Sequence, residues 1–251
     1  MKLRKLANPL FYKFNAYKKN SIDQRAVLIL GMHRSGTSCL TGSLQRAGLY
    51  LAEHHTWNPY NKLGNRENPE IFDFHENLLA ANNGTWDNPP SIVEWNESHM
   101  AWGRNFIRQF DEYKRWGFKD PRTLLTLSGW KSLLPNASYV GIFRHPIFVY
   151  QSLNARSPIS QEKAFTLWLT YNHLLLQEYK NHPFPILCFD WEPKLLNERL
   201  KQVCDNLGLN PNSDRFYEPD LHHHTKIQKT NLPSEITALY NALVYISKNQ
   251  M

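Results

Sequence analysis

Residues 26–38 constrain this chain more than any other stretch, because a short apolar run leads directly into a loop with two glycines. They read Ala-Val-Leu-Ile-Leu-Gly-Met-His-Arg-Ser-Gly-Thr-Ser, which predicts a buried strand, a loop from Gly31 to Gly36, and the start of a helix. Such a loop directs backbone N–H groups at an anion, in front of the positive end of the helix dipole. The same spacing also suits an ordinary strand-to-helix connection, so the function has to be argued from further motifs.

The loop departs from the nucleotide-hydrolysing P-loop at one position. In that pattern a Lys follows the second glycine and neutralises the terminal phosphates, and a Ser or Thr comes next. Here Thr37 stands in the place of the Lys and Ser38 fits the next position, while the positive charge comes from Arg34 inside the loop. The loop therefore predicts an anion site. It argues against a P-loop kinase or NTPase, which we keep as an alternative.

Short apolar segments alternate with helical patterns along the rest of the chain. Strands are expected at 26–30, 116–119, 139–143 and 186–189, with a short one at 49–51. Helices are expected at 37–47, 69–81, 98–115, 122–134, 146–155, 160–179, 193–207 and 233–247. This order predicts the α/β class, as a single domain with a P-loop-like parallel sheet flanked by helices on both faces. Ligands of such sheets bind at the carboxyl ends of the strands, so the polar residues that follow each strand are candidates for a site.

The positive charge of the chain is concentrated at its beginning. The 251 residues have a formal net charge of +7, which suggests a nucleic-acid-binding protein. Residues 1–25 hold seven Lys and Arg and one Asp, a net charge of +6, so residues 26–251 carry only +1. We therefore expect a basic arm over 1–25, a nearly neutral domain over 26–251, and no nucleic-acid partner. A non-catalytic nucleic-acid-binding module is kept as a second alternative that rests on charge alone.

The basic arm also has an apolar stripe opposite its lysines, formed by Leu10, Phe11, Phe14 and Tyr17. Two interpretations remain open: the stripe packs against the domain, or the arm makes a peripheral contact with an anionic membrane surface. The three cysteines lack metal-ligand spacing and cannot all pair with one another, which fits a reducing cytosol. We expect a cytoplasmic protein, with the inner face of the membrane as the place of any peripheral contact.

A second group of motifs lies at 117–156. Gly-Phe-Lys-Asp-Pro-Arg ends at Arg122, and Tyr-Val-Gly-Ile-Phe-Arg-His-Pro carries Arg144, which Ser152 follows eight residues later. Together with Gly-Met-His-Arg-Ser-Gly-Thr-Ser, these motifs resemble the sulfotransferase family over residues 26–210. The residues of these motifs are similar to those of a bacterial branch of the family, whose members commonly modify glycans.

The resemblance implies a donor, 3′-phosphoadenosine 5′-phosphosulfate, and a place for each of its phosphates. The loop would hold the 5′-phosphosulfate through His33, Arg34, Ser35, Gly36, Thr37 and Ser38. Arg144 and Ser152 would bind the 3′-phosphate. The acceptor would be a hydroxyl of a glycan or glycolipid, and no metal would be required. Arg34 suits the reaction because its permanent charge can stabilise the negative charge that develops on the bridging oxygen.

The acceptor hydroxyl needs a general base, and a Glu is suitable. In the resembled branch a Glu often follows a Gly shortly before an amphipathic helix, and Glu67 stands three residues after Gly64. Asn65 and Arg66 replace the aromatic pair of that branch, so Glu53 and the neighbouring histidines His54 and His55 are kept as rivals.

Two further features concern the substrates. Cys39 stands where cytosolic small-molecule sulfotransferases have a Trp, which argues against phenols and steroids as acceptors. Four tryptophans lie between the two donor motifs: Trp57, Trp86, Trp95 and Trp102. Each suits either core packing or contact with a sugar ring, and the sequence leaves both interpretations open.

Overall fold

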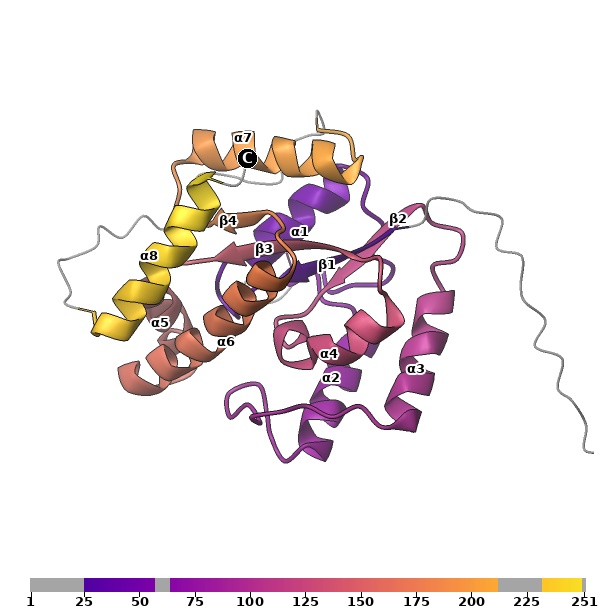
Figure 1. The fold of residues 1–251 in the computed structure, drawn as a ribbon, viewed down its shortest axis with the longest axis horizontal. Helices are drawn as coiled ribbons and strands as arrows, with labels where there is room; N and C mark the ends of the chain where they lie inside the picture. The colour runs from indigo at the N-terminus through magenta and orange to yellow at the C-terminus, as the bar shows by residue number, and fades with distance from the viewer. Residues whose placement is uncertain (1–24, 57–63, 212–231, 250–251) are drawn as a thin grey trace, which may run out of the picture.

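A computed structural model of the chain describes residues 25–56, 64–211 and 232–249. All of the predicted arm except Arg25 lies outside these residues, so the arm stays a prediction, and Trp57 lies outside them too. The described residues form four strands and eight helices in alternating order (Figure 1).

The strands make one parallel sheet in the order β2-β1-β3-β4. They are β1 (Arg25–Leu30), β2 (Arg115–Lys119), β3 (Ser138–Phe143) and β4 (Ile186–Cys188). The last five residues of β1 are buried, because β1 lies inside the sheet and is covered on both faces. Burying one aliphatic side chain of this kind contributes about 1.5–3 kcal/mol. This explains why β1 reads as an uninterrupted apolar run rather than an alternating one.

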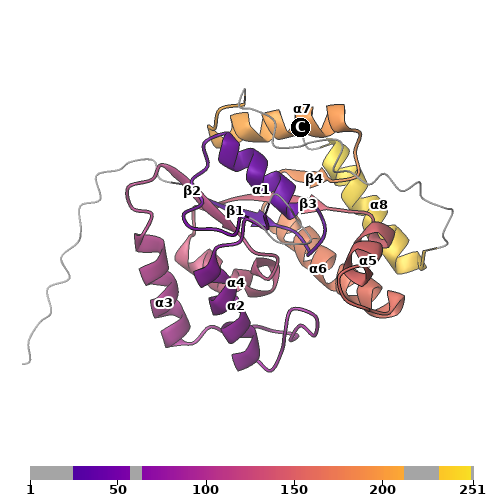
Figure 2. The same cartoon turned by 180° about the vertical axis from the view of Figure 1, so that it is seen from behind.

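Helices cover both faces of the sheet, as the alternating pattern predicted. They are α1 (Thr37–Arg46), α2 (Pro69–Ala81), α3 (Glu97–Arg108), α4 (Thr123–Leu133), α5 (Pro146–Asn154), α6 (Gln161–Asn181), α7 (Pro193–Leu207) and α8 (Ser234–Asn249). In Figure 1, α1 and α7 lie above the strands, and α2, α3, α4 and α6 lie below them; Figure 2 shows the same two layers from behind. None of the described helices combines the length and the apolar character needed to cross a membrane.

The strand order places a crevice where a ligand can bind. The chain leaves β1 toward β2 on one side and later returns to add β3 on the other side of β1. The connections that follow β1 and β3 therefore diverge at the carboxyl ends of these two neighbouring strands, which is where open α/β sheets bind ligands. The glycine loop follows β1 and Arg144 follows β3, so the fold brings both predicted anion motifs to this point.

Two predicted elements were wrong in extent. The helix predicted over 98–115 ends at Arg108, and turns lead from there to β2. The helix cannot extend to Arg115, because this residue pairs with Arg25 in the sheet. The strand predicted over 49–51 is reduced to a single bridge between Tyr50 and Trp116. The chain enters that bridge directly from a turn at Gly48, which has a positive φ of 104°.

Candidate active site

A cavity of about 820 Å³ lies at the carboxyl ends of the strands. Its wall contains most of the predicted donor residues, namely His33, Arg34, Gly36, Thr37, Ser38, Arg144 and Ser152. Glu67 and Lys119 also line it. Ser35, in the same loop, is fully buried and does not line the cavity.

The loop between β1 and α1 has the shape of an anion cradle. Arg34 and Gly36 have positive φ angles of 66° and 89°, which turn the chain sharply before the helix begins at Thr37. Gly36 is the N-cap residue, and no side chain caps the helix. The first N–H groups of a helix have no partner within it, so those of α1 are suited to a bound anion.

Gly36 is also required by its surroundings. A Cβ at this position would lie 2.3 Å from the ring of Phe189, which follows β4. We expect Gly36→Ala to lower the free energy of unfolding by more than the cost of left-handed backbone strain, which is about 1–2 kcal/mol. It should also abolish binding of adenosine 3′,5′-bisphosphate, the nucleotide that the sequence resemblance implies, because the loop has to move. Denaturant unfolding and calorimetric titration measure the two effects.

Gly48→Ala is the matched control for this substitution. Gly48 also has a positive φ, but nothing lies within 4 Å of the Cβ that it would gain. It should show the backbone strain alone and keep nucleotide binding. Equal binding by both variants would contradict the role of the Gly36–Phe189 contact.

The two predicted anion motifs touch each other across the cavity. Arg34 Nε donates a hydrogen bond of 2.8 Å to Ser152 Oγ, although the two residues are 118 positions apart. Burial, and after it the charges of Arg156 and Arg144, lower the pKa of Arg34 from its usual value. Three guanidinium groups thus act on one region of the cavity, which favours a ligand with several negative charges.

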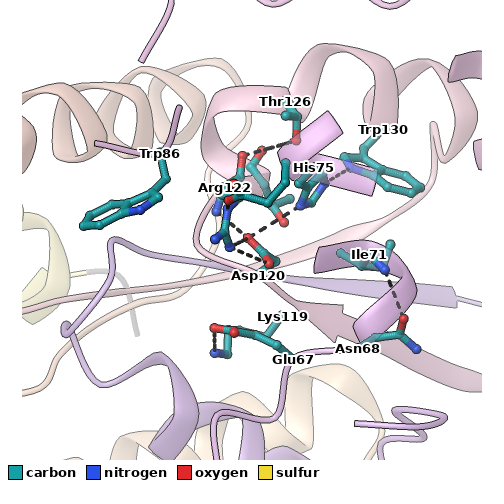
Figure 3. Close-up of polar contacts among 12 residues, drawn as sticks. Glu67, Asn68, Ile71, His75, Trp86, Lys119, Asp120, Arg122, Thr126 and Trp130 are labelled. Atoms are coloured by element: carbon teal, nitrogen blue, oxygen red, sulfur yellow. Dashed lines mark hydrogen bonds and ion pairs between the residues drawn. The ribbon is translucent and has the colours of Figure 1, made fainter. Parts of the chain in front are cut away.

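A buried ion pair faces this positive region from the end of β2. Lys119 Nζ donates a 2.7 Å hydrogen bond to Glu67 Oε1, and the two side chains are 2% and 10% exposed (Figure 3). Asn68 caps α2 by accepting a hydrogen bond from the N–H of Ile71, which places Glu67 immediately before the helix. Ser38 Oγ donates to the carbonyl oxygen of Asn65, so the anion loop is tied to the segment that carries Glu67.

The rest of the Lys-Asp-Pro-Arg motif forms a hydrogen-bonded network at the cavity wall, where Arg122 and Glu76 also line the cavity. Arg122 donates from its backbone N–H and its guanidinium to the fully buried carboxylate of Asp120, and from Nε to Glu76. Trp130 Nε1 donates to His75 Nε2, and His75 Nδ1 lies 3.5 Å from Oδ1 of Asp120 (Figure 3).

The network lowers the pKa of its buried carboxyl group, Asp120. Burial alone would raise the pKa of Asp120, but the hydrogen bond with His75 and the charge of Arg122 outweigh it and hold the pKa below its usual range. His75 is fully buried, accepts a hydrogen bond from Trp130 through Nε2, and has Nδ1 3.5 Å from the carboxylate of Asp120. The amino-acid sequence did not indicate that His75 belongs to this network, because a His on an apolar helix face also suits simple core packing.

The three described tryptophans of this stretch all pack against the core, and one of them, Trp86, also lines the cavity. Trp95 and Trp102 pack in the aromatic core, where the ring of Trp102 stacks on Phe74 with centroids 3.9 Å apart. Trp86 lines the cavity, with its ring centroid 4.5 Å from that of His33. Burial, followed by the charge of Arg122, holds the pKa of His33 well below its usual value, so His33 is neutral at pH 7.

The rival base candidates lie away from the cavity wall. Glu53 and His55 are exposed, and His54 contacts Gln45 and Arg66. Within residues 25–56, 64–211 and 232–249, no three His, Cys, Asp or Glu side chains are grouped as metal ligands. The sequence suggested two carboxylates as a base, Glu53 and Glu67. Of these two, Glu67 lines the cavity together with the anion loop, and Glu53 does not.

Comparisons with known proteins bear on the family and the fold. A sequence profile described as "Sulfotransferase family" matches residues 26–211. No significant match was found among curated protein sequences. The sulfotransferase domain from the Synechococcus PCC 7002 olefin synthase is similar in fold, with a TM-score of 0.55 and 20% identity over 88% of this chain and 95% of that chain. Sulfotransferase STF1 from Mycobacterium tuberculosis H37Rv gives a TM-score of 0.42 and 13% identity, over 90% and 76% of the two chains.

Proposed function

Since the chain belongs to the sulfotransferase family, we propose that it transfers a sulfuryl group from 3′-phosphoadenosine 5′-phosphosulfate to a hydroxyl of a glycan or glycolipid. The observation that carries the proposal is the contact between Arg34 and Ser152, which joins two anion motifs within one cavity. A donor with phosphates at both its 5′ and 3′ positions needs two such neighbouring sites.

Each end of the donor has a group of residues suited to it. The loop with Gly36, Thr37 and the N-terminus of α1 suits the 5′-phosphosulfate. Arg144 and Ser152 suit the 3′-phosphate. Ser152 Oγ accepts a hydrogen bond from Arg34, so its own hydroxyl proton is available to a phosphate oxygen.

The reaction then follows from the groups around the transferring sulfur. The bond between sulfur and the 5′-phosphate oxygen breaks, and a bond forms between sulfur and the acceptor oxygen. Glu67 accepts the proton of the acceptor hydroxyl, and Arg34 stabilises the charge that grows on the leaving phosphate oxygen. The products are the sulfated acceptor and adenosine 3′,5′-bisphosphate.

The acceptor side of the proposal rests on Trp86 and its neighbours. The half-buried indole of Trp86 and the carboxylate of Asp87 both line the cavity, and an aromatic face next to a hydrogen-bond acceptor suits a sugar ring. We extend the proposal to a cytoplasmic reaction, at the inner face of the membrane for a glycolipid. The unpaired thiols of all three cysteines and the net charge of the arm support this extension.

The direct test is transfer of labelled sulfate from the donor to extracted cell-surface polysaccharide and lipid, with products read by mass spectrometry. A sulfate ester on either fraction supports the proposal. Binding of ATP in preference to the sulfate donor, with no transfer to either fraction, would overturn it.

Arg144 provides a separate test of how the donor is bound. Losing a charge-assisted hydrogen bond costs about 1.5–3 kcal/mol, so Arg144→Ala should weaken binding of adenosine 3′,5′-bisphosphate about 10- to 150-fold. Binding of adenosine 5′-monophosphate should stay nearly unchanged, because this ligand lacks the 3′-phosphate. Calorimetric titration with both nucleotides measures the preference.

Arg104→Ala is the control, since Arg104 forms an ion pair with Glu97 on α3 and lies outside the cavity wall. If Arg144→Ala keeps the wild-type preference for the 3′-phosphorylated nucleotide, the assignment of the 3′-phosphate to Arg144 is wrong.

A further inference from the structure

The carboxylate of Asp190 joins the ends of two neighbouring strands. Asp190 follows β4, which pairs with β3 in parallel, so it lies beside the residues that follow β3. Its Oδ1 accepts a hydrogen bond of 3.3 Å from Arg144 Nε, and its Oδ2 accepts one of 2.6 Å from the backbone N–H of His145. One side chain therefore holds both the side chain of Arg144 and the backbone just after it.

Three aromatic residues restrict Arg144 further. Its Cζ lies 5.4 Å from the ring centroid of Phe148 and 5.2 Å from that of Phe189. Its carbonyl oxygen accepts a hydrogen bond from Trp168 Nε1. A long side chain that is free in solution loses conformational entropy when it binds a ligand, and these contacts remove part of that cost in advance.

The geometry leaves one edge of the guanidinium unused. Asp190 takes the Nε side, and the Nη groups of Arg144 have no hydrogen-bond partner among the described residues. Arg144 and Asp190 are each 15% exposed, and Arg144 lines the cavity. A phosphate can therefore be bound end-on by the two Nη groups, in the forked manner that arginine favours.

We propose that Asp190 is a positioning residue for donor recognition, which orients the Nη groups of Arg144 toward the 3′-phosphate. This inference rests on the proposed function, because it requires a ligand with that phosphate. A carboxylate near an anion site also repels the ligand. Positioning and repulsion predict opposite effects when the carboxylate is removed, and this makes the proposal testable.

The experiment is a double-mutant cycle on the full chain, read as the preference for adenosine 3′,5′-bisphosphate over adenosine 5′-monophosphate. We expect Asp190→Ala to lower this preference about 2- to 10-fold, the loss that follows when one long side chain has to be ordered on binding. In the Arg144→Ala background the same substitution should have no further effect on the preference, because Asp190 acts through Arg144.

Asp190→Asn guards against loss of folding. It keeps an oxygen that can accept from the N–H of His145 but removes the charge that holds Arg144, so the preference should fall while the melting temperature stays near wild type. Binding of the monophosphate reports whether the loop after β1 is intact in every variant.

The outcomes separate the two proposals. If the wild type itself shows no preference for the bisphosphate, the proposed function fails. If the wild type shows it, Arg144→Ala loses it, and both Asp190 variants keep or increase it, repulsion dominates and the positioning role is wrong. Equal effects of Asp190→Ala in the presence and absence of Arg144 would also overturn it, because they indicate a general structural role.

Discussion

Replacing Glu67 by Gln is expected to lower the rate of sulfuryl transfer about 10²- to 10⁴-fold, the range usual for loss of a general base. Gln has the same shape and keeps an oxygen that can accept from Lys119, but it cannot take a proton from the acceptor. The variant should stay folded and bind adenosine 3′,5′-bisphosphate as the wild type does. Single-turnover transfer and calorimetric titration measure the two quantities separately.

The structure gives this prediction its physical basis. Glu67 is buried, lines the cavity, and is held by Lys119 at the end of β2. Its position is set from both sides, by the N-cap Asn68 and by the hydrogen bond from Ser38 to the preceding loop.

Glu53→Gln is the control for this prediction. Glu53 is an exposed carboxylate 14 positions earlier that is not part of the cavity wall. Its substitution should leave transfer near the wild-type rate. A selective loss in Glu53→Gln, with normal turnover in Glu67→Gln, would move the base to the segment after α1.

Replacing Arg34 by Ala should lower turnover about 10²- to 10³-fold, as expected for loss of one group that stabilises charge in the transition state. Binding of adenosine 3′,5′-bisphosphate should weaken less than turnover falls, because the charge that Arg34 stabilises grows during the reaction. The comparison is between the rate of transfer at saturating substrates and the dissociation constant of the product.

Two variants refine this comparison. Arg34→Lys keeps the charge but loses the guanidinium geometry that reaches Ser152, so partial activity is expected. Ser152→Ala removes the contact and leaves the charge of Arg34 in place. Equal losses of turnover and of product binding in Arg34→Ala would assign Arg34 to uniform binding instead.

The sequence predicted the fold well where the signal was local. The strands at β1, β2, β3 and β4 were found within one or two residues, because each is a short apolar run between turn or helix signals. The error at α3 has a physical reason. Phe106 lies within the helix and Phe110 lies two residues after its last residue, Arg108, yet both pack in the same core. Their spacing of four residues therefore continues the helical pattern beyond the end of the helix.

The site was predictable as a set of motifs and not as a set of contacts. The glycine loop and the Arg144 motif are contiguous stretches, so their types could be recognised along the chain. The partners Lys119 and Glu67 are 52 positions apart, and Arg144 and Asp190 are 46 apart. No periodicity links such pairs, since their meeting depends on which strand lies beside which in the sheet.

The order of strands also has a consequence during synthesis of the chain. β1 is made first among the four strands, and its two neighbours in the sheet begin at least 85 residues after β1 ends. The apolar sequence of β1 is therefore synthesised well before the strands that pair with it. Asp190 follows Ser38 by 152 residues, which at usual elongation rates is a delay on the order of 10 s. The proposed 3′-phosphate site, which includes Arg144 and Asp190, can therefore form only after β4 has been made.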